Sequence, residues 1–136
     1  MKRRTIEDYL RTIYLLHEKS EDKGKGIRSV DISESLGVSK PTVSEMVKKL
    51  RKNGYISMSP YSRIHMTKKG VRKAERLTHN FRVINVFLKE VLDYENFRKM
   101  DEEAHRLEHA FSEESIKRLD EYLNNPATCP KGERIH

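Results

Sequence analysis

Apolar residues recur at helical spacing through most of the chain, and the polar breaks between them delimit six expected helices. In residues 6–19 the apolar positions share one face, and Thr5 is a suitable N-cap with two acids in the following turn. Residues 56–59 and 64–66 instead alternate apolar with polar side chains, which predicts two short strands joined by a turn. The remaining expected helices cover residues 30–36, 40–52, 68–92, 97–110 and 113–124. The sequence therefore predicts a mainly α chain with one two-stranded hairpin.

The second and third expected helices form a helix-turn-helix pattern. Gly37 can adopt the left-handed conformation that ends the first of them, and Ser39 caps the next. The apolar residues from Val43 to Leu50 make one buried stripe, whereas the opposite face is polar and basic. The hairpin follows directly, as a wing does, and we expect Arg63 at its tip to meet phosphate. The residues expected to contact DNA are Ser39, Lys40, Pro41, Thr42, Ser44, Lys48, Lys49 and Arg63.

Charge is divided unevenly along the chain. Residues 1–73 hold 18 Lys or Arg and 8 Asp or Glu, whereas residues 74–136 hold 10 and 13. The basic half is suited to bind a polyanion such as double-stranded DNA, although a surface rich in Lys and Arg is also typical of thermophile proteins. The alternative for this half is a small α/β core without a ligand. The apolar stripe, the helix cap, the basic face and the wing agree with one another, so we expect residues 1–73 to form a DNA-binding domain rather than a core without a ligand.

The second half, residues 74–136, predicts an all-helical domain that depends on a partner. Its long helix carries more apolar surface than one neighbour can cover, so we expect a homodimer, which also supplies two DNA-reading units. With 136 residues, the chain has no room for a large enzyme. Its longest apolar run is four residues, Ile13 to Leu16, so we expect no membrane-spanning helix, which needs about 20. No signal peptide is recognisable, and a single cysteine fits a cytoplasmic protein.

The segment HRLEH carries the clearest candidate chemistry. His105, Glu108 and His109 are related by i, i+3 and i+4, so they project from one helical face. Two imidazoles and a carboxylate are ligands for a first-row divalent metal. The alternatives are a surface helix that carries two histidines by chance, or a Glu–His pair at a polar core position. The segment also matches H-x-x-E-H, where zinc hydrolases use Glu as general base, but the chain leaves no room for a substrate cleft.

Five segments, in this order along the chain, resemble the diphtheria-toxin-repressor family, which includes the iron-dependent repressors and the manganese transport regulators. The segments are IEDYLRTIYLL, DISESLGVSKPTVSEMVKKLRKNGYI, IHMTKKG, DEEAHRLEHAFSEESIKRL and NPATCPKG. The resemblance implies an N-terminal winged helix-turn-helix followed by an all-helical metal-binding and dimerisation domain, without the SH3-like domain of longer members. It implies a metal-dependent transcriptional repressor that binds operator DNA as a homodimer, and not an enzyme.

The resemblance also implies a primary metal site that joins Asp8, near the start of the first helix, to His105, Glu108 and His109. Without the resemblance, a helix-capping role would be preferred for Asp8. Relatives usually have Cys or Glu where this chain has His105, and the neutral nitrogen ligand favours Fe²⁺ over Mn²⁺, with Zn²⁺, Co²⁺ or Ni²⁺ as surrogates. Arg11 stands where manganese-type members have a glutamate, which favours a single primary ion over a two-metal cluster.

The second, ancillary metal site of the family is incomplete in this sequence. The resemblance places it at His79 and Cys129, but Val83 stands in place of a glutamate and Lys131 in place of a histidine. Asp101 or Glu102 would compensate in part. The rival to a metal-dependent repressor is a metal-independent winged-helix regulator that senses a small molecule in a helical pocket. Operator binding that ignores metal would favour that rival.

Overall fold

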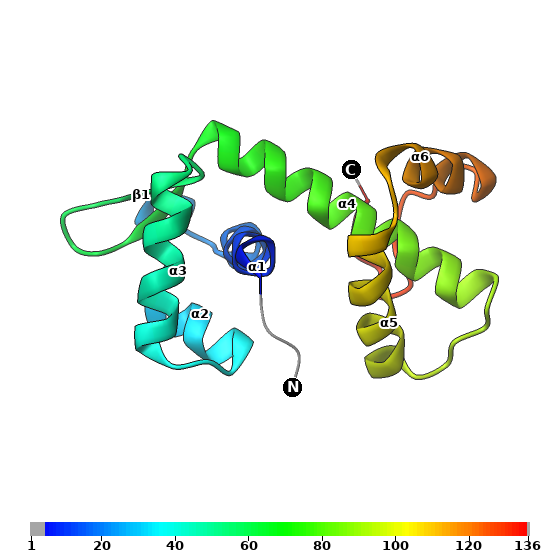
Figure 1. The fold of residues 1–136 in the computed structure, drawn as a ribbon, viewed down its shortest axis with the longest axis horizontal. Helices are drawn as coiled ribbons and strands as arrows, with labels where there is room; N and C mark the ends of the chain where they lie inside the picture. The colour runs from blue at the N-terminus through cyan, green and yellow to red at the C-terminus, as the bar shows by residue number, and fades with distance from the viewer. Residues whose placement is uncertain (1–4, 136) are drawn as a thin grey trace. The chain divides into compact units, whose positions relative to one another are not determined.

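The computed structural model describes residues 5–135, apart from the side chain of Lys23 (Figure 1). The helices and strands expected from the sequence are all present in this part of the chain, and none of its helices is both long and apolar enough to cross a membrane. The contacts divide the chain into two compact units, residues 1–75 and 76–136. The elements are α1 (Ile6–Lys19), a 3-10 turn (Lys23–Lys25), α2 (Ser29–Leu36), α3 (Lys40–Lys52), β1 (Ile56–Met58), β2 (Ile64–Met66), α4 (Lys68–Glu90), α5 (Phe97–Ala110) and α6 (Glu113–Tyr122).

An aliphatic core holds the three helices of the first unit together. Gly37 adopts the expected left-handed conformation, with φ 64° and ψ 37°, which ends α2 and lets the chain turn into α3. A side chain at this glycine would meet open space, so the requirement is for backbone conformation alone. The fully buried aliphatic residues contributed by α1, α2 and α3 are Leu10, Ile13, Ile32, Val43 and Leu50, each at most 1% exposed.

The wing is an antiparallel hairpin with a third segment on its edge. Strand β1 pairs with β2 in the register Ile56↔Met66 and Met58↔Ile64, and the loop between the strands projects away from α1–α3 (Figure 1). Ile27, just before α2, exchanges two backbone hydrogen bonds of 2.8 Å with Ile64 of β2. The wing is thereby tied to the segment that precedes the helix-turn-helix.

The start of α4 is fixed by a close approach to the chain at Tyr55. The N–H of Thr67 donates to the carbonyl of Tyr55 at 3.1 Å, and the Thr67 hydroxyl donates to the carbonyl of Gly54 at 2.6 Å. A Cβ at Gly70 would lie 2.0 Å from the carbonyl oxygen of Tyr55. Only glycine fits this position without moving the backbone, which explains the glycine of the segment IHMTKKG.

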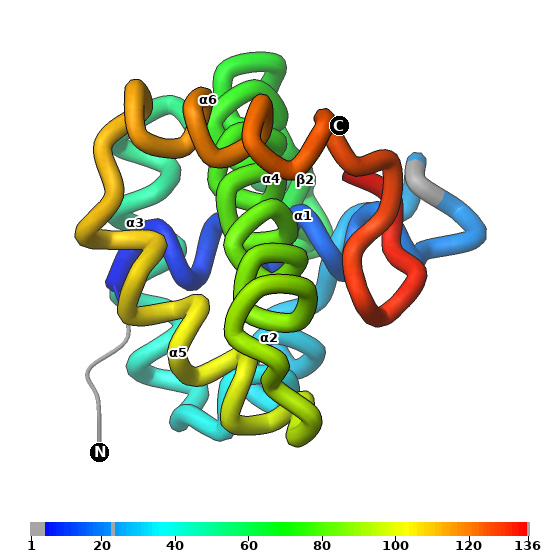
Figure 2. The backbone as a smooth tube through the Cα atoms, turned by 90° about the vertical axis from the view of Figure 1, so that its right-hand side faces the viewer, coloured from blue at the N-terminus to red at the C-terminus, as the bar shows by residue number. Residues whose placement is uncertain are grey.

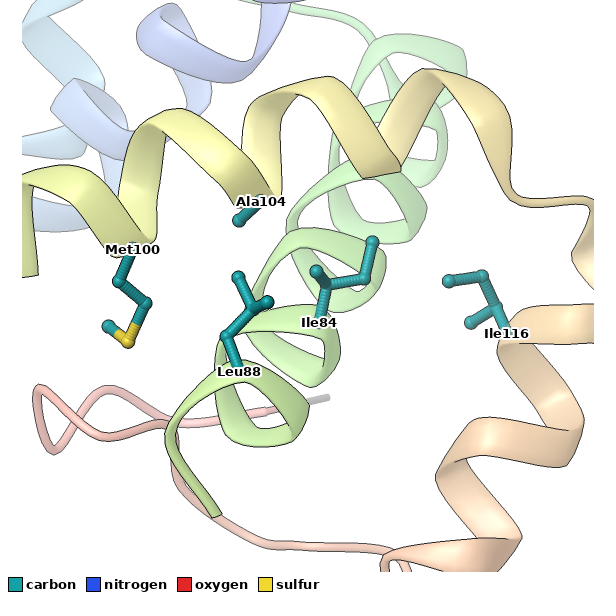
Figure 3. Packing of buried hydrophobic residues seen from close by; sticks show 5 residues of the cluster. All are labelled: Ile84, Leu88, Met100, Ala104 and Ile116. Carbon is teal, nitrogen blue, oxygen red and sulfur yellow. The ribbon is translucent and has the colours of Figure 1, made fainter. Parts of the chain in front are cut away.

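The second unit has its own apolar core, made by α4, α5 and α6. Figure 3 shows Met100 and Ala104 of α5 pointing toward Ile84 and Leu88 of α4, with Ile116 of α6 beside them. All five are at most 5% exposed. Partly buried aromatic and aliphatic residues surround this cluster, among them Phe81, Phe87, Tyr94, Leu107, Phe111 and Leu119.

The chain after α6 doubles back as a narrow loop that is bound to α4 (Figure 2). Backbone hydrogen bonds of 2.8–2.9 Å join Cys129 to Glu133 and Ile135 to Ala127. Arg82 of α4, with a side chain only 4% exposed, binds the loop. Its guanidinium donates to the carbonyl of Arg134 at 2.6 Å and to the carboxylate of Glu133 at 2.9 Å. The tail is therefore an ordered part of the second unit.

Candidate DNA-binding face and metal-ligating residues

The outer face of α3 presents the side chains that the sequence predicts for DNA contact. Val43, Val47 and Leu50 are buried on the core side, at most 5% exposed. The hydroxyl of Ser39 accepts a hydrogen bond from the N–H of Thr42 at 3.3 Å, so the expected cap is formed. The candidate contact residues on and beside this helix are all exposed: Ser39, Lys40, Pro41, Thr42, Ser44, Lys48 and Lys49.

The basic residues of α3 differ from Arg28 and Lys73 of the same unit in having no acidic partner. Arg28 pairs with Asp31 at 3.0 Å, and this contact raises the pKa of the Arg28 guanidinium above its ordinary value. Lys73 pairs with Glu7 at 3.3 Å. Within residues 5–135, no ion pair is formed by Lys40, Lys48, Lys49, Arg51 or Lys52 of α3. These charges remain available for phosphate.

The sequence predicted Arg63 at the tip of the wing, and this prediction is wrong. The N–H of Ser59 donates to the carbonyl of Arg63 at 2.9 Å, so these two residues face each other at the base of the turn. The N–H of Ser62 donates to the carbonyl of Ser59 at 3.0 Å, which closes the turn above them. Tyr61 occupies the tip with 87% of its side chain exposed, whereas Arg63 is half-buried. The sequence interpretation missed Tyr61, although its place inside the turn was the available signal.

Two of the candidate metal ligands, His105 and His109, lie together near the end of α5, and Glu108 comes just before His109 in the same helix. The rings of His105 and His109 meet edge to face, with centroids 5.1 Å apart. His105 and Glu108 are half-buried and His109 is exposed. Met100 and Ala104 of the same helix are instead fully buried in the core of the second unit. The helix therefore keeps these nitrogen and oxygen donors at its surface, a donor set that suits a first-row divalent metal.

Asp8 has the capping role that was its alternative interpretation. One of its carboxylate oxygens accepts a hydrogen bond from the N–H of Thr5 at 2.7 Å, and the N–H of Asp8 donates to the Thr5 hydroxyl at 3.2 Å. Together these contacts form a capping box at the start of α1. The other carboxylate oxygen lies 3.8 Å from the guanidinium of Arg11. Asp8 is 3% exposed, and capping occupies only part of the acceptor capacity of its two oxygens.

Two of the three ancillary candidates have another side-chain partner in the second unit, and the third is buried. His79 lies 2.8 Å from the carboxylate of Asp120 on α6. Asp101 is paired with the ammonium of Lys131. Cys129 is 6% exposed within the tail loop. Among the described residues, these three do not form a cluster that could hold an ion.

Comparisons with known proteins match both halves of the chain. Residues 1–64 match the iron dependent repressor N-terminal DNA binding domain, and residues 67–136 match the iron dependent repressor metal binding and dimerisation domain. The structure is similar to that of the manganese regulator SloR, with a TM-score of 0.86 and 40% identity, over 98% of this chain and 60% of that one.

Two curated relatives are 34% identical to the chain. One is the iron-dependent repressor IdeR of Mycobacterium tuberculosis strain H37Rv, over 131 residues, 96% of this chain and 55% of IdeR. The other is an uncharacterised HTH-type transcriptional regulator of Methanocaldococcus jannaschii, over 119 residues, 88% of this chain and 92% of the relative. The chain thus spans about half the length of IdeR.

These relatives are transcriptional regulators and repressors rather than enzymes, which confirms the prediction of a regulator over a zinc hydrolase. The fold, with its two-stranded wing and following helical domain, agrees with the resemblance seen in the sequence. Both halves match in the expected order. The chain therefore belongs to the iron-dependent repressor family of metal-dependent transcriptional repressors.

Proposed function

We propose that this chain is a dimeric repressor that binds operator DNA when a divalent metal is bound, and that Fe²⁺ is preferred over Mn²⁺. The observation that carries the proposal is the pairing, in one chain, of an α3 face whose cations have no acidic partner with a helix that presents His105, Glu108 and His109 together. The first feature suits a nucleic acid and the second a metal.

In this proposal, Asp8 completes the metal site with His105, Glu108 and His109. A bound ion would supply a link between a ligand on α1 and ligands on α5, and no reaction. Asp8 belongs to the DNA-binding unit and the α5 ligands to the second unit. The metal raises the affinity for DNA only to the extent that it binds the DNA-binding arrangement of the protein more tightly than other arrangements. By linkage, DNA raises the affinity for the metal by the same factor.

The preference for Fe²⁺ follows from the nature of the donors. Two imidazole nitrogens and two carboxylates suit Mn²⁺, Fe²⁺, Co²⁺, Ni²⁺ or Zn²⁺. The affinity of such a site for the metal generally rises from Mn²⁺ through Fe²⁺ and Co²⁺ to Ni²⁺. His105 supplies a neutral nitrogen, which penalises Mn²⁺, the hardest of these ions, more than Fe²⁺. Ni²⁺, Co²⁺ and Zn²⁺ are expected as surrogates in the purified protein. The guanidinium of Arg11, 3.8 Å from Asp8, opposes a second ion at this place.

DNA recognition is proposed to divide between the charged and the small residues of α3. Lys48 and Lys49 contact phosphates, which supply most of the affinity and a strong salt dependence. Thr42 and Ser44, nearer the start of the helix, contact base edges in the major groove. Pro41 beside them offers an apolar surface for a thymine methyl group.

Dimerisation is proposed to cover an apolar surface between α4 and α5. Val91 and Leu92, which follow α4, are 45% and 52% exposed, and Phe97 at the start of α5 is 43% exposed. Large apolar side chains that are exposed next to one another favour a protein interface. The matched metal binding and dimerisation domain, residues 67–136, contains all three. Two copies would present two α3 helices to two half-sites.

The test is a DNA-binding titration with the full chain, using a duplex selected from a random library. Fe²⁺, Mn²⁺, Co²⁺, Ni²⁺ and Zn²⁺ are added separately without oxygen, with a chelator as control. We expect tight binding with metal and weak binding with chelator. Equal binding under chelator would favour the metal-independent regulator instead.

Ion preference is tested with His105→Glu in the same assay. Wild type should respond at lower free Fe²⁺ than Mn²⁺, and the variant should narrow this gap because a hard anionic ligand replaces the imidazole. The matched control is Arg106→Lys, a change on the same helix at an exposed residue paired with Glu103. A variant with an unchanged Fe²⁺ to Mn²⁺ ratio would remove His105 as the selectivity residue.

A further inference from the structure

One acidic residue lies in the middle of the basic outer face of α3. Glu45 is the only Asp or Glu in the sequence KPTVSEMVKKLRK. It comes two residues after Val43 and two before Val47, which are both buried, so its side chain lies about 200° around the helix from each. Glu45 is exposed, as expected from this position.

Glu45 makes no ion pair or side-chain hydrogen bond within residues 5–135. Lys48 and Lys49 follow it at i+3 and i+4, the spacing of a helical ion pair, yet within residues 5–135 neither makes such a pair with it. Other acids of the unit do have structural contacts, since Glu7 pairs with Lys73 and Asp31 with Arg28. A free carboxylate at this place repels phosphate and lowers the general affinity of α3 for DNA.

A hydrogen-bond donor on the edge of a DNA base would offset the repulsion between Glu45 and phosphate. A carboxylate only accepts hydrogen bonds, and in the major groove cytosine presents an amino group as donor. Guanine presents two acceptors there, and thymine an acceptor and a methyl group, so both would leave the carboxylate unpaired. Adenine places an acceptor beside its amino group, which suits an amide better than a carboxylate.

We infer that Glu45 is a specificity-determining residue that selects cytosine at one position of each half-site by accepting a hydrogen bond from its N4 amino group. The inference rests on the proposed DNA-binding function of α3. Glu45 is the sixth residue of that helix, on the face that also carries Pro41 and Thr42. Residues in this first part of a recognition helix are the ones that reach base edges.

The experiment selects bound sequences from a randomised duplex library with the full chain, in the presence of Fe²⁺ or Mn²⁺ and, separately, of chelator. Wild type, Glu45→Gln, Glu45→Ala and Lys49→Ala are compared. We expect wild type to enrich cytosine at one position per half-site. Glu45→Gln should change this preference to adenine, because Gln pairs with the N6 and N7 of adenine. Glu45→Ala should lose about a tenfold to hundredfold discrimination at that base pair.

The other arms separate base reading from charge. Binding of Glu45→Ala to random duplexes should be equal to or tighter than that of wild type, because a repulsive charge is removed. Lys49→Ala should weaken binding to every duplex and keep the selected base. If both Glu45 variants select the same sequences as wild type, the inference is overturned. If wild type selects no sequence with any ion, the proposed function itself fails.

Discussion

The cations of α3 in the first unit and two basic residues of the second unit are used in opposite ways. In the first unit, the cations of α3 are exposed and without ion pairs among the described residues. In the second unit, Arg82 is buried against the tail, and His79 is placed against Asp120. A charge that leaves water is costly unless it is paired, whereas an exposed cation keeps its hydration until a ligand arrives. The cations of α3 are thus available to a ligand, whereas Arg82 and His79 are engaged in contacts within the second unit.

The largest expected effect tests how tightly α4 is joined to the first unit. Gly70→Ala places a Cβ 2.0 Å from the carbonyl oxygen of Tyr55, so the backbone must move. We expect a loss of about 3 kcal/mol in the free energy of unfolding, measured by urea denaturation. Gly37→Ala is the control, because its new side chain meets no neighbouring atom and only the left-handed backbone conformation disfavours alanine. We expect this variant to lose about 1 kcal/mol in the free energy of unfolding. Equal losses would contradict the claim of a close approach at Gly70.

The second prediction tests whether buried charge holds the tail. Arg82→Met removes the donor to Glu133 and to the carbonyl of Arg134. We expect a destabilisation of about 2 kcal/mol, since Glu133 is left unpaired at a partly exposed place. Cys129, the single cysteine of the chain, is buried in the tail, so the rate of thiol labelling should rise.

Arg106→Met is the control for the loss of an arginine as such. Its ion pair with Glu103 is exposed on α5, with 58% of the arginine side chain accessible. We expect the labelling rate of Cys129 to stay at the wild-type value. Faster labelling in both variants would show that Arg82 has no particular hold on the tail.

The third prediction concerns the unpaired cations. Lys49→Ala should weaken binding to selected and random duplexes alike, by about eightfold at 0.1 M salt for one lost phosphate contact. The slope of log affinity against log salt should fall by about one. Thr42→Ala should instead act mainly on the selected duplex. Fluorescence anisotropy across a salt series measures the DNA affinity of both variants. If Thr42→Ala weakens binding to random DNA as much as to the selected duplex, Thr42 is not a base contact.

The smallest expected effect is at the tip of the wing. Tyr61→Ser should leave the free energy of unfolding within about 0.5 kcal/mol of wild type, because the side chain is almost fully exposed. Loss of one hydroxyl contact to phosphate should weaken DNA binding by about threefold. Arg63→Ala, at the base of the turn, should have the lesser effect on binding. The opposite order would restore Arg63 as the main wing contact.

The parts of the fold that depend on nearby residues could be predicted from the sequence. Helix caps at Thr5, Ser39 and Ser112, and the left-handed Gly37, each involve contacts within a few residues. The outward face of α3 followed from the spacing of its apolar stripe. Ile32 was not singled out, because α2 has eight residues and offers little periodicity to reveal which side is buried.

Contacts between distant residues were not predictable from local pattern. Arg82 meets the tail across 51 and 52 residues, and His79 meets Asp120 across 41. Pro and Gly obscure any strand pattern in the tail, yet it forms an ordered loop. The candidate metal ligands on α5 could be selected from their i, i+3 and i+4 spacing, whereas nothing in the local pattern around Asp8 indicates a metal ligand. The proposal of Asp8 as a ligand depends on the resemblance alone.

The contact between Ile27 and β2 has a consequence for solubility. A free strand edge offers unpaired N–H and C=O groups that can recruit strands of other molecules and begin aggregation. Ile27 occupies the side of β2 away from β1 with two hydrogen bonds, and each strand of the hairpin is only three residues long. The outer side of β2 is therefore closed to strand addition at that point. This protection allows an exposed wing to remain on the surface without becoming a template for self-association.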